Sequence, residues 1–169
     1  MTSFRRIPLY LATAILMGGA AQAQSSNSDS ATASASATIV SAIAIAKTAD
    51  LDFGEVVAGG TSGTVVLSTA NERSVTGGST LGNAAGAAAA SFSVTGDSDG
   101  SFSITLPSST TITDGTNDMT VDNFVSSPAD SSTLSSGTAT ISVGATLNVD
   151  ADQVAGSYTG TFDVTVTYN

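Results

Sequence analysis

The feature that most constrains the fold is an alternation of apolar and Ser or Thr residues in short runs. The longest run places these residues on one face: Ala139, Ile141, Val143, Ala145, Leu147 and Val149. Successive side chains of a strand point to opposite faces, so this period of two predicts strands with one buried and one solvated side. Gly, Asp, Asn, Ser and Pro separate the runs, and no window has a convincing helical period. The sequence therefore predicts an all-β antiparallel β-sandwich.

Individual runs allow more specific expectations. The runs at 91–95 and 102–106 flank the turn residues 96–100, which predicts a β-hairpin with a longer loop. Gly144 interrupts the longest run and is expected at a bulge or bend. A last strand is expected over residues 158–168. One core is expected to hold Phe53, Phe92, Val94, Phe102, Ile104, Ile141, Val143, Leu147, Phe162, Val164 and Val166.

The first residues have the composition of a secretory signal peptide. Arg5 and Arg6 form a positive n-region, residues 7–20 form an apolar h-region, and residues 21–23 (AQA) provide a cleavage site. The alternative is a transmembrane anchor, but the apolar stretch is short for a hydrocarbon core of ~30 Å. We expect a signal peptide over residues 1–23, with cleavage before Gln24. The protein is then exported through the inner membrane to the periplasm and from there to the cell surface or the medium.

The charge balance excludes several classes of partner. The chain has 14 acidic and 4 basic residues, and two of the basic ones lie in the expected signal peptide. Only Lys47 and Arg73 then remain against the acids, so neither nucleic acid nor an anionic membrane surface is an expected partner. Beyond the signal no long apolar run remains, and we expect no membrane-spanning segment after cleavage.

The residues needed for catalysis or metal binding are scarce. The chain has no His, Cys or Trp, and Lys47 is the one remaining candidate base for a serine nucleophile. We therefore expect no enzyme, no catalytic residue, no cofactor and no metal. Residues 97–100 (DSDG) resemble a fragment of a calcium loop but lack its third Asp or Asn and its later Glu. That segment and residues 114–118 are better explained as turns, although calcium binding there stays open.

The segment before the expected domain is of low complexity. Residues 24–37 are rich in Ser and Ala, which is typical of a flexible linker, and the sandwich domain is expected over 38–169. From Ala31 to Ile39, however, the segment alternates strictly, with Ala on one face and Ser or Thr on the other. This is strand periodicity built from small residues. The alternation continues less cleanly through Ile43 and Ile45.

Several motifs carry a family resemblance. The run Gly156–Asn169 resembles the C-terminal signature of chaperone–usher pilins, with Gly fourteenth from the end and a penultimate Tyr. It also resembles spore coat protein U-like fimbrial subunits. Together, LDFG at 51–54, SFSVTG at 91–96 and the ending VGATLNV to YTGTFDVTVTYN resemble the bacterial domain of unknown function 4402, over residues 37–169. The resemblance implies an immunoglobulin-like or pilin-like sandwich, although the cysteine pair of many pilins is absent.

In pilins, the sandwich lacks one strand, and the N-terminal extension of the next subunit fills the groove. The resemblance therefore implies β-strand donation, with a homopolymer, a periplasmic chaperone and an outer-membrane usher as expected partners. It implies a pairing strand with Gly156, Tyr158, Phe162, Val164, Val166 and Tyr168. The segment Ala31–Ile45 is the candidate donor, with most of its apolar contact from Ile39, Ile43 and Ile45. Alternatively, residues 39–45 are the domain's own first strand and residues 24–37 are a tether.

These observations lead to two functional hypotheses. The first is a non-catalytic, exported structural subunit of a bacterial surface filament or fimbria. The second is a self-sufficient secreted or cell-surface β-sandwich that binds a ligand through its loops. The sequence identifies no ligand and no strand order, so function rests on an analogy at the level of the fold.

Overall fold

The computed structural model describes residues 27–169, and one compact unit spans Thr38–Asn169. Residues 27–37 contain no strand and are exposed. The all-β prediction is confirmed, because the described residues form strands and no helix. The strands are β1 (Ala44–Ala49), β2 (Val56–Val57), β3 (Gly63–Leu67), β4 (Arg73–Gly77), β5 (Thr80–Leu81), β6 (Ala90–Thr95), β7 (Ser101–Thr105), β8 (Ser109–Thr113), β9 (Asp118–Ser127), β10 (Ser131–Thr133), β11 (Thr138–Val149) and β12 (Thr165–Tyr168).

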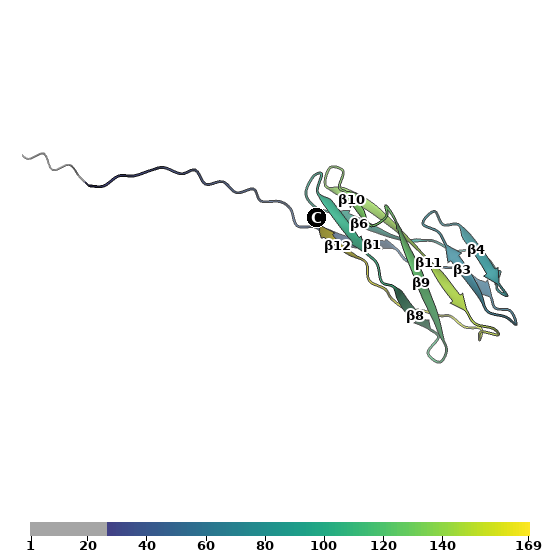
Figure 1. Ribbon diagram of the computed structural model, residues 1–169. Coiled ribbons are helices and arrows are strands. Elements are labelled where there is room, and N and C mark those ends of the chain that lie inside the picture. Colours follow the sequence, from purple (N-terminus) through teal and green to yellow (C-terminus); the bar gives the residue numbers. More distant parts are fainter. Residues whose placement is uncertain (1–26) are drawn as a thin grey trace, which may run out of the picture. The chain divides into compact units, whose positions relative to one another are not determined.

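The strands form antiparallel sheets that face each other as layers of a sandwich (Figure 1). The larger sheet has the order β1-β6-β11-β3-β4, and β9 pairs with the other edge of β11 and with β8. The second sheet has the order β10-β7-β12. A short ribbon of β2 and β5 completes the fold. The predicted antiparallel sandwich is therefore confirmed.

Strand β11 is the centre of the larger sheet, and Gly144 lies where its neighbour changes. Residues 138–143 pair with β6, and residues 145–149 pair with β3. On the other edge, the register with β9 shifts between Gly144 and Thr146, which confirms the expected bulge or bend. A Cβ at Gly144 would lie 2.3 Å from the carbonyl oxygen of Leu67, so only glycine lets the end of β3 lie this close to β11.

The apolar side chains form two clusters instead of the single core expected from the sequence. One contains Phe53, Val65, Leu67, Met119, Val121, Ala145, Leu147 and Val149. The other contains Ala90, Phe92, Val94, Phe102, Ile104, Leu134, Ile141 and Val143. Leu51 and Phe124 contact both clusters, whereas Phe162, Val164 and Val166 lie half-buried at the margin of the second. Burial of each large side chain stabilises the fold by about 1.5–3 kcal/mol.

The hairpin expected from β6 and β7 is wrong. Strand β6 pairs with β1 and β11 in the larger sheet, and β7 pairs with β10 and β12 in the other. Their apolar residues nevertheless belong to one cluster, because the two strands face each other across the sandwich. An alternating pattern shows that a strand has one buried face, but it does not show which sheet the strand joins.

Candidate functional site

The most distinctive feature of the domain is the boundary between its two sheets. Strand β1 ends the larger sheet and β12 ends the smaller one, and the two strands lie close together near the carboxyl end of the chain (Figure 1). Along this boundary the sandwich is closed at one end and open at the other. The boundary is therefore the place to look for a binding site.

At the closed end, the hydroxyl of Tyr168 links two segments of the chain by hydrogen bonds. Its hydroxyl accepts a hydrogen bond from the backbone N–H of Asp97 (2.5 Å) and donates one to the carbonyl of Ser41 (3.0 Å). A Cβ at Gly96 would lie 2.1 Å from this hydroxyl, and one at Gly100 would lie 2.8 Å from the ring. The two glycines therefore leave the space that the tyrosine occupies. The contact joins the chain just before β1 to the end of β12.

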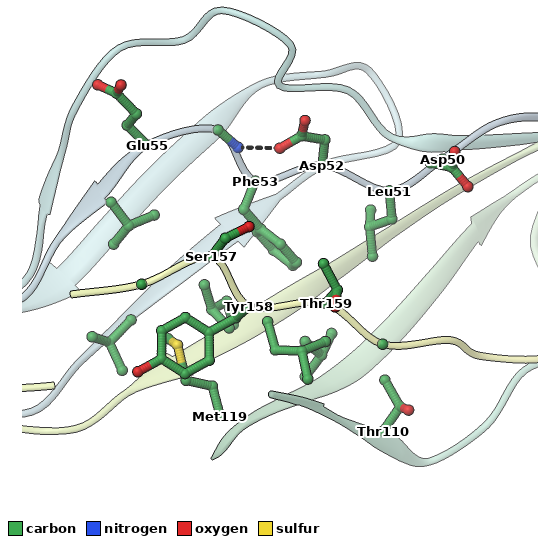
Figure 2. A pocket seen from close by; sticks show the side chains of 18 of the residues that line it. Asp50, Leu51, Asp52, Phe53, Glu55, Thr110, Met119, Ser157, Tyr158 and Thr159 are labelled. Carbon is green, nitrogen blue, oxygen red and sulfur yellow. Dashed lines mark hydrogen bonds between the residues drawn. The ribbon is translucent and has the colours of Figure 1, made fainter. Parts of the chain in front are cut away.

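Away from Tyr168, the two segments separate and leave a groove of about 990 Å³ (Figure 2). One wall is formed by residues 47–58 and the other by residues 153–162. Leu51 and Phe53 point from the first wall into the groove, whereas the carboxylates of Asp52 and Glu55 point away from it. The floor includes Phe92, Met119, Val121, Leu147 and Val149, from both apolar clusters. The groove thus has an apolar floor between two backbone segments.

The first wall is shaped by the motif at residues 51–54. Asp52 forms an isolated antiparallel bridge with Ala88, with both N···O distances at 2.9 Å. The Asp52 carboxylate also accepts a hydrogen bond from the N–H of Gly54 (2.7 Å), the bond drawn in Figure 2. Gly54 has a φ of +68°, a conformation that side chains rarely adopt. The aspartate and the glycine together make the turn after Phe53 and aim its ring at the groove floor.

The side chain of Arg73 stabilises this turn through three hydrogen bonds. Its guanidinium donates to the carbonyls of Phe53 (2.9 Å) and Glu55 (3.2 Å), and to that of Gly82 (3.1 Å). A planar guanidinium with several N–H donors suits this task better than a lysine ammonium. Sequence reasoning missed this role, although Arg73 is the one arginine outside the expected signal peptide.

The second wall differs from its prediction. A strand was expected over 158–168, but regular pairing is confined to β12, where Thr165–Tyr168 pair with β7. Before it, Thr159 makes an isolated bridge with Thr113, and the carbonyl of Thr161 accepts a hydrogen bond from the Thr110 hydroxyl (2.7 Å). The strand beside this wall is interrupted between β7 and β8 by residues 106–108, and the proline among them has no N–H.

The segment that follows Thr159 has unpaired backbone groups. Within the described chain, residues 160–164 make no backbone–backbone hydrogen bond. Thr159 and Thr161 direct their polar groups toward β8. Alternate residues of an extended segment point to opposite edges, so Gly160 and Phe162, which line the groove, direct theirs toward it. The groove therefore has an apolar floor and a free hydrogen-bonding edge.

Three residues of the expected pairing strand, Gly156, Tyr158 and Phe162, line this second wall. Phe162 contacts Phe92 edge-on, with ring centroids 6.4 Å apart, and Phe124 at 4.9 Å. Val164, Val166 and Tyr168 continue toward the closed end, against the second cluster. At the open end, the Tyr158 hydroxyl donates to the carbonyl of Val154 (2.7 Å). Gly156 lies beside Asp114, whose Oδ2 would be 3.0 Å from an added Cβ.

The three candidate donor residues occupy different environments. Ile45 lies in β1 opposite Val94, and Ile43 packs against the second cluster of the same chain. Both side chains thus belong to the domain's own sheet region. Ile39, by contrast, is 96% exposed, and Val40 is 55% exposed. Their role in donation stays a prediction, but only Ile39 of the three is fully available to another molecule.

The acidic turns have local structural roles. The carboxylate of Asp114 accepts hydrogen bonds from the backbone of Asn117 (2.7 Å) and Thr116 (2.8 Å). The bonds from Asn117, its backbone first, and from Thr116 lower the pKa of Asp114 to about 2. The N–H of Asp97 is bonded to Tyr168. In the part of the chain that the structure describes, no three His, Cys, Asp or Glu residues are grouped to hold a metal ion.

Residues 27–169 also contain no helix that is long and apolar enough to cross a membrane. A family model, described as a domain of unknown function (DUF4402), matches residues 43–168. No curated protein and no solved structure matches the chain. The matched residues include β1 and β12, and therefore both walls of the groove. The resemblance to the domain of unknown function 4402 is confirmed, and the chain belongs to the DUF4402 family.

Proposed function

We propose that this protein is an exported, non-catalytic structural subunit of a surface filament, assembled by insertion of a β-strand from one copy into the groove of another. The observation that supports it is the unpaired edge at residues 160–164 beside an apolar groove of about 990 Å³. An added strand would form hydrogen bonds with this edge, which is the pattern of β-augmentation. The composition of residues 1–23 supports export.

The form of the groove suits an extended chain. Its second wall, residues 153–162, is itself a run of ten residues, and a strand rises about 3.3 Å per residue. The N–H and C=O groups of this edge recur along the backbone instead of gathering at one point. They can therefore form hydrogen bonds with another main chain along its length. A periplasmic chaperone and an outer-membrane usher would serve such a subunit before assembly.

The experiment compares two exposed valines. Val154 lines the groove and is 54% exposed, whereas Val125 lies on β9 outside the groove and is 53% exposed. Val154→Asp should reduce the sedimentable or SDS-resistant fraction of the chain that begins at Gln24. Val125→Asp should leave that fraction unchanged. A chain that stays monomeric at all concentrations, alone and with a partner strand, would favour the secreted binding module instead.

A further inference from the structure

Resting on the proposed function, we propose that the inserted strand is residues 31–39 of a second copy, with one specific face against the groove. That face consists of Ala31, Ala33, Ala35, Ala37 and Ile39. This segment is shorter than the candidate donor Ala31–Ile45 expected from the sequence. The last part of that candidate already packs within its own domain. Ile45 pairs within β1, and Ile43 packs on the domain's own core.

The first argument is availability. Residues 31–40 are exposed and make no hydrogen bond within the described chain. Their backbone can therefore pair with another edge without breaking bonds of its own. Ile39 and Val40 are large apolar side chains exposed by 96% and 55%, next to a domain that buries comparable side chains fully.

The second argument is length. The unpaired edge covers residues 160–164, and the strand that fills it needs at least as many residues. Residues 31–39 span up to about 30 Å when fully extended. The segment can thus pair with the whole free edge and still reach further along the groove. Its alternation is strict over this length, so one register keeps every apolar side chain on the same side.

The third argument is the size of the side chains. The floor residues Met119, Val121 and Leu147 are only 8%, 2% and 4% exposed before anything enters. The groove thus offers backbone pairing over a nearly complete core, with little uncovered floor for bulky anchors. A face of alanines fits a groove with so little uncovered floor, and Ile39 supplies one larger side chain at its end.

The fourth argument is charge. Carboxylates lie along the first wall at Asp52 and Glu55, and Asp163 lies within the unpaired segment. Like charges would repel an acidic strand from this rim. Residues 31–40 contain no charged side chain, although the whole chain has 14 acids and 4 bases. The segment is therefore electrically compatible with the groove.

The test uses neighbouring residues on opposite faces of the segment. Ala35→Asp would bring a charge onto the groove floor, whereas Ser36→Asp brings the same charge to the opposite face. In the chain from Gln24, Ala35→Asp should lower the sedimentable fraction roughly tenfold or more, because a buried, unpaired carboxylate is costly. Ser36→Asp should leave it nearly unchanged. Where the wild-type chain is monomeric, a peptide of residues 28–40 should raise its melting temperature, and the Ala35→Asp peptide should not.

Cross-linking identifies the contact directly, because the chain has no cysteine. A copy with Ala35→Cys or Ala37→Cys, mixed with a copy carrying Val154→Cys or Val57→Cys in the groove, should form disulfide-linked dimers under mild oxidation. Copies with Ser34→Cys or Ser36→Cys should form far fewer. Cross-links of equal yield from both faces would overturn the assigned face.

The outcomes separate this inference from the function on which it rests. If Val154→Asp abolishes assembly while Ala35→Asp has no effect, another strand or a helper protein fills the groove, and the inference is wrong although the function stands. If neither substitution affects assembly, the groove is not the assembly site and both proposals fail. If the wild-type chain neither assembles nor responds to the peptide, both fail as well.

Discussion

The closed and open ends of the boundary between the sheets are made by the same two chain segments, yet they differ in structure. At the closed end, Ile43 and Ile45 lie against the same apolar cluster as Val164 and Val166, and Tyr168 ties the segments together. At the open end, the segments diverge around a groove of about 990 Å³. The two ends differ because the segments have different neighbouring strands at each end.

The comparison shows how a segment with the sequence of a strand keeps an unpaired edge. Strand β12 is regular because β7 pairs with it, whereas residues 160–164 have an alternating sequence but no regular neighbour. The open wall thus has the sequence of a strand without the pairing. An exposed, unpaired edge is a hazard in a protein that works alone, because it invites association. In a subunit that assembles through this edge, the same property is the function.

The largest expected effect is a difference in the free energy of unfolding between substitutions in the core of the closed end and on the wall of the open groove. Phe102 is fully buried, and Phe102→Ala should lower the free energy of unfolding by about 3–5 kcal/mol. Phe162 is only half-buried on the groove wall, so Phe162→Ala should cost less, about 1–2 kcal/mol. Urea unfolding of both variants measures the difference. Equal losses would mean that the groove wall is as much part of the core as the closed end.

A second effect concerns the arginine behind the first wall. Removing the three hydrogen bonds of Arg73 with Arg73→Met should lower the free energy of unfolding by about 2 kcal/mol. Arg73→Lys keeps the positive charge but lacks the planar set of N–H donors, and should therefore recover only part of the lost stability. In the Arg73→Met variant, hydrogen exchange should be accelerated more at the backbone of residues 52–55 than at the closed end. Complete rescue by lysine would indicate that charge matters there and not geometry.

The third prediction compares two tyrosine hydroxyls. Tyr168→Phe leaves the Asp97 N–H without its acceptor and should lower the free energy of unfolding by about 1–2 kcal/mol. Tyr158→Phe, at the open end, removes a more exposed bond to Val154 and should cost about half as much. Thermal unfolding checks the order of the two variants. The reverse order would contradict the role of Tyr168 in holding the sheets together.

The smallest effect depends on pH. The folded-state pKa of Asp114 is lowered from 3.8 to about 2, mainly by the backbone of Asn117, so the charged form stabilises the fold above pH 3.8. That contribution is lost as the pH falls from 3.8 toward 2, because the carboxylate is then protonated. Asp114→Asn should therefore flatten the stability curve in this window alone. A wild-type and a mutant curve that run parallel between these pH values would refute the assignment.

Much of the fold could be predicted from local patterns. Alternation located the strands at Phe92, Phe102 and Ile141, and glycine at 144 marked the irregularity in β11, because both signals are local in the chain. The C-terminal motif drew attention to Gly156, Tyr158 and Phe162, which line the second groove wall, whereas their role in pairing stays a prediction. The first wall was noted only as a motif at residues 51–54, and the Arg73 contacts behind it were not predicted.

The sequence by itself determined the class of the fold, the solvated and buried faces of its strands, and the absence of histidine and cysteine chemistry. Tertiary structure decided which sheet each strand joins, as the separation of β6 from β7 shows. It also decided that Ile43 and Ile45 serve the domain itself while Ile39 stays exposed. The reason is physical: a period of two records that a side chain is buried, but the partner that buries it comes from distant parts of the chain.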